Sequence, residues 1–367
     1  MDLAAYEAAG LYDPRAANAE ERRALLEWLA AQGIGLPALE ACGGNPAGLK
    51  WIAGDRALLP SNGITLAELA RRAQLPVERV QAIRLAAGLP PLPPEAAVFS
   101  PDSVPAFAAF AEAAELFGEA AVEQFVRVIG SALARLAEGA LALFLVSLEG
   151  PRRSTEATEL SLAQTNLRAT ESLARIPEVL RGLFLDHVRT AIQRVREARP
   201  GATASTLQLA IGFVDLVGFT PLGLSRSLRE LAEVVERFEA TAHEVATLRN
   251  GRVVKLVGDE VMFAAVDPAA ACDIALTLVE RLCCGLPVAP RGGIAYGEVL
   301  LRGGDYYGPV VNLAARLAEL AVPTELLVTP EVARSGATAP GIRFEPAGKR
   351  LPKGHDVPVT LFALERA

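Results

Sequence analysis

Three segments in the second half of the chain carry residue types that bind metal ions and phosphates. In the first, Phe213-Val-Asp-Leu-Val-Gly-Phe-Thr220, Asp215 ends an apolar, strand-like run, and Thr220 is the expected cap of a helix that opens at Pro221. Carboxylate oxygens are ligands that Mg²⁺ prefers. The free amides of a helix N-terminus suit nucleotide phosphates. This segment therefore predicts metal and nucleotide binding in one place.

A second acid, Asp259, is expected at the tip of a strand-turn-strand hairpin. Residues 253–256 and 261–265 are strand-like apolar runs, and Val257-Gly-Asp259 between them predicts a turn. Taken alone, an aspartate after glycine is more often a turn residue than a metal ligand. If the hairpin lies beside the strand that ends at Asp215, the two carboxylates can share one or two divalent cations.

The third segment, residues 305–316 (DYYGPVVNLAAR), combines an acid with a helix start and two polar groups. Pro309 is expected to open a helix, which places Asn312 and Arg316 four residues apart on one face. Taken alone, this pair is more typical of a solvated helix surface. Together with the two aspartates it predicts an amide and a guanidinium that face a nucleotide.

The elements that must position these groups follow from the hydrophobic periodicity. Strand-like and helical patterns alternate over residues 206–367, which predicts a mixed α+β domain. Residues 1–199 are patterned almost wholly as helices, and the breaker-rich residues 200–205 predict a linker. The expected fold class is therefore α+β, with an all-α domain in front of the α+β domain.

Taken together, the runs FVDLVGFT, VVKLVGDEVMF and DYYGPVVNLAARL resemble the catalytic domain of class III adenylyl cyclases over about residues 206–364. The resemblance implies a ferredoxin-like domain that forms a head-to-tail homodimer with its catalytic pocket at the interface. It implies an adenylate cyclase that converts ATP to 3′,5′-cyclic AMP and pyrophosphate. It also implies two Mg²⁺ or Mn²⁺ ions per site as cofactors.

The resemblance assigns the reacting groups by position. Asp215 and Asp259 match the two metal-binding aspartates of the family. Asn312 matches the residue that orients the ribose, and Arg316 matches the residue that stabilises the transition state. All of these positions hold the expected residue types, which favours an active enzyme.

Further positions are matched to substrate binding. Lys255 and Asp305 match the pair that reads adenine, because a lysine can donate to N1 and an aspartate can accept from the exocyclic amine. Phe219 and Thr220 are expected near the nucleotide. Lys353 is the best match to a lysine that contacts the triphosphate, although two basic residues at positions 349 and 350 lie close by. Guanylyl cyclases resemble this motif with Glu and Cys in place of the base-reading pair, so ATP is the expected substrate.

The helical half of the chain contains one further recognisable pattern. Residues 64–90 predict two short helices around a turn at Leu75-Pro76, which resembles a helix-turn-helix of transcription regulators. Its arginines only slightly outnumber its acids, so a structural hairpin is favoured over DNA binding. The apolar faces of residues 107–148 predict packing or dimerising helices, with a pocket for an apolar ligand as the alternative.

The same half contains no cluster of catalytic residue types, which predicts a regulatory domain in signal transduction. Its resemblance to the helical N-terminal regions of bacterial cyclases implies autoinhibition. It joins the catalytic domain through a helix over about residues 177–198. Acidification and a small apolar molecule are both candidate signals. His187 in that helix can titrate near neutral pH, although an ordinary surface histidine is the more common case.

Composition limits the partners and the compartment. A formal net charge of −7 over 367 residues argues against a dominant polyanion-binding surface, so nucleic acid is not an expected partner. The most lipid-like run, residues 139–148, is about half of a membrane span, and no secretion signal is present. The four cysteines lack paired spacing and are expected to be reduced thiols. We therefore expect a cytoplasmic protein without a membrane span.

Two alternatives to an adenylate cyclase remain open. A degenerate cyclase fold can act as a nucleotide sensor or a DNA-binding regulator, but such relatives are expected to lose metal or base-reading residues. A diguanylate cyclase is the nearest enzymatic alternative, because Val257-Gly-Asp-Glu-Val261 partly resembles its hairpin signature. That signature's first glycine and final phenylalanine are missing here.

Overall fold

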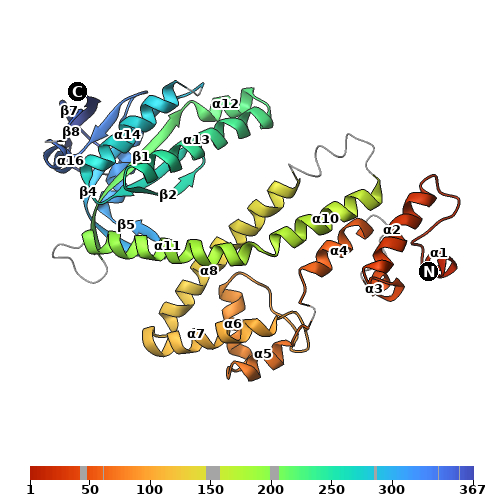
Figure 1. The fold of residues 1–367 in the computed structure, drawn as a ribbon. Helices are drawn as coiled ribbons and strands as arrows, with labels where there is room; N and C mark the ends of the chain where they lie inside the picture. Colours follow the sequence, from red (N-terminus) through yellow and green to blue (C-terminus); the bar gives the residue numbers. More distant parts are fainter. Residues whose placement is uncertain are drawn as a thin grey trace. The chain divides into compact units, whose positions relative to one another are not determined.

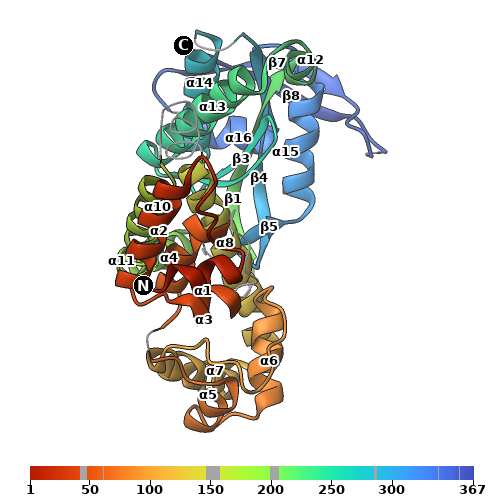
Figure 2. The same cartoon turned by 90° about the vertical axis from the view of Figure 1, so that its right-hand side faces the viewer.

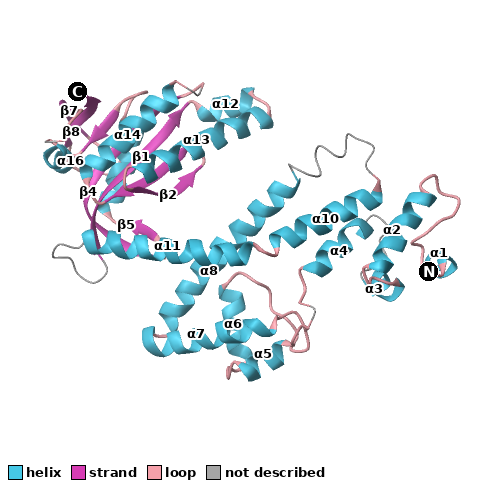
Figure 3. Cartoon of the chain, in the orientation of Figure 1, coloured by secondary structure: helices cyan, strands magenta, loops and turns pink. Residues whose placement is uncertain are grey.

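The computed structural model describes the whole chain except residues 42–47, 61, 146–157, 199–205, 285–286, 338 and 355. The chain divides into two compact units, Met1–Leu185 and Asp186–Ala367 (Figure 1). The first unit is helical, whereas the strands belong to the second (Figure 3). The linker expected at residues 200–205 lies outside the described residues. None of the described helices is both long enough and apolar enough to cross a membrane.

The N-terminal unit is built from helices that bury two groups of apolar side chains. Its elements are α1 (Leu3–Ala8), α2 (Ala19–Ala31), α3 (Leu36–Ala41), α4 (Leu49–Ala57), α5 (Leu66–Arg72), α6 (Val77–Ala86), η2 (Pro101–Ser103), α7 (Val104–Phe117), α8 (Glu119–Phe144), α10 (Glu159–Leu173) and the first part of α11 (Ile176–Glu197). One cluster joins α2 and α4 to α10. The Arg22 guanidinium donates to both carboxylate oxygens of Glu159 at 2.7 Å, which ties α2 to the start of α10. Two further clusters form the second group and join α5, α6, α7 and α8.

Residues 64–90 form two short helices around a turn, as predicted. The turn contains Gln74 in a left-handed conformation with φ 56°. Ile83 of α6 packs against Val122 of α8, so the hairpin is part of the helical core. The Arg84 guanidinium lies 5.5 Å from the centroid of the Phe99 ring. These contacts use one face of the hairpin for packing, which supports its structural interpretation.

The C-terminal unit is a sheet covered by helices on both faces. Its strands are β1 (Thr206–Val217), β2 (Gly251–Val257), β3 (Glu260–Ala265), β4 (Ala289–Arg302), β5 (Asp305–Tyr307), β6 (Leu326–Val328), β7 (Ile342–Arg350) and β8 (Val359–Arg366). Its helices are α12 (Phe219–Ser225), α13 (Leu228–Leu248), α14 (Pro268–Cys283), α15 (Pro309–Leu320) and α16 (Pro330–Gly336). The second part of α11 also belongs to this unit, since Ala198 directly after it is buried beneath the sheet.

The strand order identifies the core topology. The eight-stranded sheet runs β2-β3-β1-β4-β6-β8-β7, with β5 paired to β4. In its first four strands every neighbouring pair is antiparallel. One helical connection separates β1 from β2 and another separates β3 from β4, which gives the βαββαβ arrangement of a ferredoxin-like fold. The predicted fold class is therefore confirmed.

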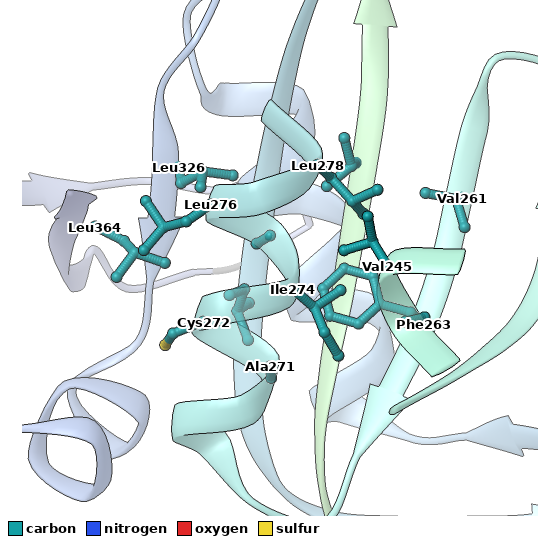
Figure 4. Close-up of a cluster of buried hydrophobic side chains, with 14 of the residues drawn as sticks. Val245, Val261, Phe263, Ala271, Cys272, Ile274, Leu276, Leu278, Leu326 and Leu364 are labelled. Atoms are coloured by element: carbon teal, nitrogen blue, oxygen red, sulfur yellow. The ribbon is translucent and has the colours of Figure 1, made fainter. Parts of the chain in front are cut away.

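Strand β1 lies at the centre because both of its faces are apolar. Alternate residues point to opposite faces of a strand, and here the even-numbered set packs under α13 and α14 while the odd-numbered set packs under α15. Figure 2 shows α13 and α14 on one side of the sheet and α15 on the other. The first layer includes Val245, Ile274 and Phe263 (Figure 4). The Phe263 ring covers Gly212, where an added Cβ would lie 2.1 Å from the ring. These layers hold the ends of β1 and β4 in place.

Candidate active site

Asp215 lies near the end of β1, between two other polar side chains. It is directly opposite Glu260 of β3 and directly opposite Arg291 of β4, so the three side chains share one face of the sheet. Arg291 Nε and Nη2 donate to Asp215 Oδ2 at 3.1 and 2.9 Å. The side chains of Arg291 and Asp215 are only 25% and 21% exposed, so this ion pair is partly shielded from water.

The turn between β2 and β3 brings Asp259 to the same end of β1. The Leu216 amide donates to the Asp259 carbonyl at 3.1 Å, which joins the turn to the residue after Asp215. The predicted hairpin therefore does lie beside the first strand. This geometry brings together two acids that are 44 residues apart in the sequence (259 minus 215).

Negative charge is concentrated around this turn. Partial burial raises the pKa of the Asp259 carboxyl, and the charge of Asp215 adds to the rise. Burial and the charge of Asp215 raise the pKa of Glu260 to about 7. No hydrogen bond or ion pair joins the Glu260 carboxylate to another residue in the described part of the chain. The crowded carboxylates thus form a place where added positive charge is favourable.

Lys255 and Asp305, the expected base-reading pair, contact each other. Lys255 Nζ donates to Asp305 Oδ2 at 2.6 Å, and the Tyr306 amide donates to Asp305 Oδ1 at 2.8 Å. Arg252 supports this region, since its Nη2 donates to the Gly304 carbonyl at 2.8 Å. The pair remains accessible, because the lysine side chain is 40% exposed and that of the aspartate 25%.

Helix α15 carries Asn312 and Arg316 on the side away from the sheet. Asn312 is exposed, and Arg316 forms an ion pair with Glu319 one turn later. The helix lies close to β4 because Gly293 has no side chain: an added Cβ would lie 2.4 Å from Leu317 Cβ. Gly293 therefore fixes how closely the helix that carries these two polar side chains packs on β4.

The remaining predicted residues have mixed outcomes. The prediction that Thr220 caps a helix opening at Pro221 is wrong, because α12 begins at Phe219 with Gly218 as its N-cap. Gly218 has φ 85°, and this left-handed conformation turns the chain before Thr220 is reached. The Phe219 side chain is partly buried and packs against the core. The Thr220 side chain lies outside the described residues.

One ion pair narrows the choice among the basic residues near the C-terminus that could contact the triphosphate. Lys353 is exposed in the connection between β7 and β8. Arg350 binds Glu325, with Nη2 donating to Oε1 at 2.8 Å, so this nearby cation already has a structural partner. Arg350 is therefore the weakest of the three basic matches, and Lys353 stays the predicted residue for a phosphate contact.

Sequence reasoning missed Arg291 and Glu260. Glu260 directly follows Asp259, and Arg291 stands in the strand-like run before Gly292-Gly293. Period-two alternation places Glu260 on the face opposite to that of Val261, which is a signal that could have identified it. Arg291 gave no comparable signal, because its role depends on which strand lies beside it.

Comparisons with known proteins agree over most of the chain. No family model matches it. An uncharacterized protein of Mycobacterium tuberculosis is 31% identical over 369 residues, which cover 99% of this chain and 94% of that protein. A pH-sensitive adenylate cyclase of Mycobacterium tuberculosis is 30% identical over 94% of this chain and 88% of that protein. An adenylate cyclase of Streptomyces coelicolor is 35% identical over 69% of this chain and 67% of that protein.

A solved structure of the adenylyl cyclase CyaB from P. aeruginosa aligns with 44% of this chain and 95% of that chain, at 23% identity and a TM-score of 0.41. The ferredoxin-like sheet with acids at the end of its first strand is the arrangement expected of a class III nucleotidyl cyclase. Given the sequence relatives, the chain belongs to the class III adenylate cyclases. The predicted family and enzyme class are thereby confirmed.

Proposed function

We propose that the chain converts ATP to 3′,5′-cyclic AMP and pyrophosphate at sites that two copies of the chain share. The observation that carries this proposal is the meeting of Asp215 and Asp259 at the end of β1, through the hydrogen bond from Leu216 N to the Asp259 carbonyl. The relatives named adenylate cyclase, one of which aligns with 94% of the chain, support the substrate.

Asp215 and Asp259 are the residues that would hold Mg²⁺ or Mn²⁺. Their surroundings fit a cation, because the negative charge of Asp215 already raises the pKa of both Asp259 and Glu260. Within the described residues, no group of three His, Cys, Asp or Glu side chains is arranged to hold a metal ion alone. Phosphate oxygens and water would therefore complete the coordination. A bound divalent cation offsets phosphate charge and lowers the pKa of the ribose hydroxyl.

The reaction requires control of charge at the α-phosphate. The ribose 3′-oxygen bonds to the α-phosphorus, the bond from that phosphorus to the bridging oxygen breaks, and pyrophosphate leaves while the hydroxyl proton passes to solvent. Arg316 offsets the charge on the α-phosphate oxygens, and Asn312 orients the ribose. Lys353 binds the outer phosphates, and the backbone at Phe219 and Thr220 lies beside them. Removing a preorganised group such as Arg316 is expected to cost about 10²-fold or more in kcat.

Base selection follows from hydrogen-bond polarity at Lys255 and Asp305. When adenine binds between them, their ion pair is replaced by two hydrogen bonds. Lys255 donates to adenine N1, and the exocyclic amine of adenine donates to the Asp305 carboxylate. Guanine presents the reverse pattern at these two positions, so a lysine and an aspartate disfavour it. ATP is therefore the preferred nucleotide.

The positions of the two groups support a shared site. Asp215 is opposite Arg291, near the start of β4, whereas Asp305 is opposite Arg302 at its other end. One copy of the chain thus carries Asp215 and Asp305 at opposite ends of a 14-residue strand. A second copy in head-to-tail arrangement supplies the missing half of each site.

Two inactive variants test this arrangement together with the activity. Asp215→Ala lacks a metal ligand, and Arg316→Ala lacks the transition-state residue, but a mixed dimer contains one intact site. If equal amounts are mixed and subunits exchange freely, about half of the dimers contain one copy of each variant. Each of these dimers has one working site out of two, so the activity should return to about a quarter of wild type. A mixture no more active than its components would refute the shared site.

The helical unit is proposed to regulate how the catalytic domains meet. Helix α11 begins in the first unit and ends in the second. Val195 in this helix and Ala198 just after it pack against the core of the second unit. Acidification and a small apolar molecule remain the candidate signals, and the relative named pH-sensitive supports the first. A truncated protein that begins at Asp186 keeps these contacts. Equal activity of the truncated and full chains at every pH from 5 to 8 would contradict this proposal.

A further inference from the structure

Two basic residues of β2 contact the short hairpin that carries Asp305. Strand β5 pairs with the end of β4, and the turn between these strands consists of Gly303 and Gly304 in left-handed conformations, with φ 61° and 81°. Lys255 binds the Asp305 carboxylate, as described above. Arg252 Nη2 donates to the Gly304 carbonyl at 2.8 Å. The hairpin is therefore attached to β2 through two side chains.

A β-bulge in β2 places both basic side chains on the same face of the sheet. The register of β2 against β3 shifts between Val253 and Lys255. Before the bulge, Arg252 is opposite Ala264, and after it Lys255 is opposite Met262. Ala264 and Met262 lie in the same buried layer, beneath α15. Residues three apart in a regular strand point to opposite faces, so without the bulge one of the two cations would point away from the hairpin.

Arg252 contacts the residues on both sides of Asp305. On one side is its hydrogen bond to the Gly304 carbonyl. On the other side, its guanidinium carbon lies 5.7 Å from the centroid of the Tyr306 ring, which is a cation–π contact. Tyr306 is buried in the core, and its amide donates to Asp305 Oδ1 at 2.8 Å. The backbone around Asp305 is therefore held by Arg252, whereas its carboxylate is held by Lys255.

We propose that Arg252 is a positioning residue that sets the preference of the site for adenine. The inference rests on the proposed function, in which adenine binds between Lys255 and Asp305. Bound adenine replaces their ion pair, so the hairpin loses its contact with Lys255. Arg252 keeps its contacts, because neither of them involves the Asp305 carboxylate. It thereby holds the carboxylate where the exocyclic amine of adenine can donate to it.

The Arg252→Gln variant tests this role by comparing adenine with guanine nucleotides. KM for ATP should rise about tenfold, the scale of one hydrogen bond from a charged donor, while kcat for ATP stays within about threefold of wild type. The preference for ATP over GTP in kcat/KM should fall about tenfold. Arg252→Lys keeps one donor for the Gly304 carbonyl but loses the planar group over Tyr306, so it should restore part of the preference.

A double-mutant cycle shows whether Arg252 acts through Asp305. In an Asp305→Ala background, Arg252→Gln should change the preference for ATP over GTP by less than about twofold, because no carboxylate remains to be positioned. A second tenfold loss in this background would indicate a separate contact with the nucleotide and overturn the positioning role.

The matched control is Arg343→Gln. Arg343 is an exposed strand arginine of the same unit, on β7 at the opposite edge of the sheet from β2. It forms ion pairs with Glu345 and Glu365. This variant should keep the wild-type preference for ATP over GTP, and urea unfolding checks that all variants fold.

Nucleotide binding without turnover separates this inference from the proposed activity. 3′-Deoxy-ATP and 3′-deoxy-GTP lack the attacking hydroxyl, so their dissociation constants, measured by calorimetry with Mn²⁺, depend on base selection and not on cyclisation. A preference for 3′-deoxy-ATP that falls about tenfold in Arg252→Gln, but not in the Asp305→Ala background, supports the inference. An unchanged preference in Arg252→Gln overturns it, as does equal binding of both analogues by wild type. A wild-type protein that prefers 3′-deoxy-ATP but forms no cyclic AMP from ATP would refute the proposed activity, and the binding ratios would still decide the role of Arg252.

Discussion

The contact between Gly293 and α15 allows an effect on catalysis to be estimated from geometry. A Cβ added at Gly293 would lie 2.4 Å from Leu317 Cβ and 2.5 Å from both the Ala314 carbonyl oxygen and the Ala318 amide nitrogen. Ordinary contacts begin near 3.4 Å, so Gly293→Ala must move α15 away from β4 by about 1 Å. None of these atoms is the end of a flexible side chain, so the helix itself has to shift.

The displaced helix carries Asn312 and Arg316. A misplacement of about 1 Å costs about 10²-fold in rate, whereas overpacking of this kind costs about 1–3 kcal/mol in stability. Gly293→Ala should therefore remain folded while kcat for ATP with Mn²⁺ falls about 100-fold. The assay is initial rate at saturating ATP, with unfolding in urea and dimer mass by light scattering measured in parallel.

Gly182→Ala is the matched control. It lies in α11, and an added Cβ meets no described atom within 4 Å. This variant should keep wild-type activity and gain slightly in stability, because alanine favours a helix over glycine. A Gly293→Ala protein that retains kcat within twofold of wild type would refute the claim that close packing of α15 on β4 positions the reacting groups.

Three further predictions follow from contacts in the C-terminal unit. Lys255→Ala should raise KM for ATP and reduce the preference for ATP over GTP by about 10- to 100-fold, while Mn²⁺ binding without nucleotide stays unchanged; an unaltered ATP/GTP ratio would exclude base reading. The pKa of Glu260 is raised from 4.5 to about 7, so wild-type stability in EDTA should fall as pH rises through this window. Glu260→Gln should remove this pH dependence. Above pH 7 its free energy of unfolding in urea should exceed that of wild type by about 1–2 kcal/mol, which is half of the value that the pKa shift alone gives because the side chain is partly exposed. Cys283 and Cys284 are exposed, whereas burial raises the pKa of Cys272 to about 12, so a thiol reagent should label the pair in the native protein and Cys272 only on unfolding. Equal labelling rates at Cys272 and Cys283 would contradict this.

The elements of the catalytic domain were predictable because their signals are local. The apolar run before Asp215 predicts β1, and the turn around Asp259 follows from a glycine between two strand-like runs. Pro309 at the start of α15 places Asn312 and Arg316 on one face without knowledge of the fold. Local signals failed at Gly218, where a left-handed residue starts α12 earlier than the Thr-Pro pattern predicts.

The partners of Asp215 could not be predicted, because they depend on strand register. Glu260 and Arg291 become its neighbours only when β3 and β4 pair with β1 in the observed alignment. Shifting either strand by one residue would turn the side chain to the other face. Arg291 Nη1 also donates to the Glu319 carbonyl near the end of α15, and this hydrogen bond forms only because α15 packs on β4.

The central claim is that Asp215 and Asp259 together support cyclisation of ATP by this chain. The most direct measurement is product identification by mass spectrometry after the purified 367-residue chain is incubated with ATP or GTP and Mn²⁺ or Mg²⁺. Wild type should release 3′,5′-cyclic AMP and pyrophosphate in equal amounts and prefer ATP, and Asp215→Ala and Asp259→Ala should each abolish both products. Cyclic AMP formed at the wild-type rate by either variant, or no cyclic nucleotide from wild type with any metal, would contradict the account.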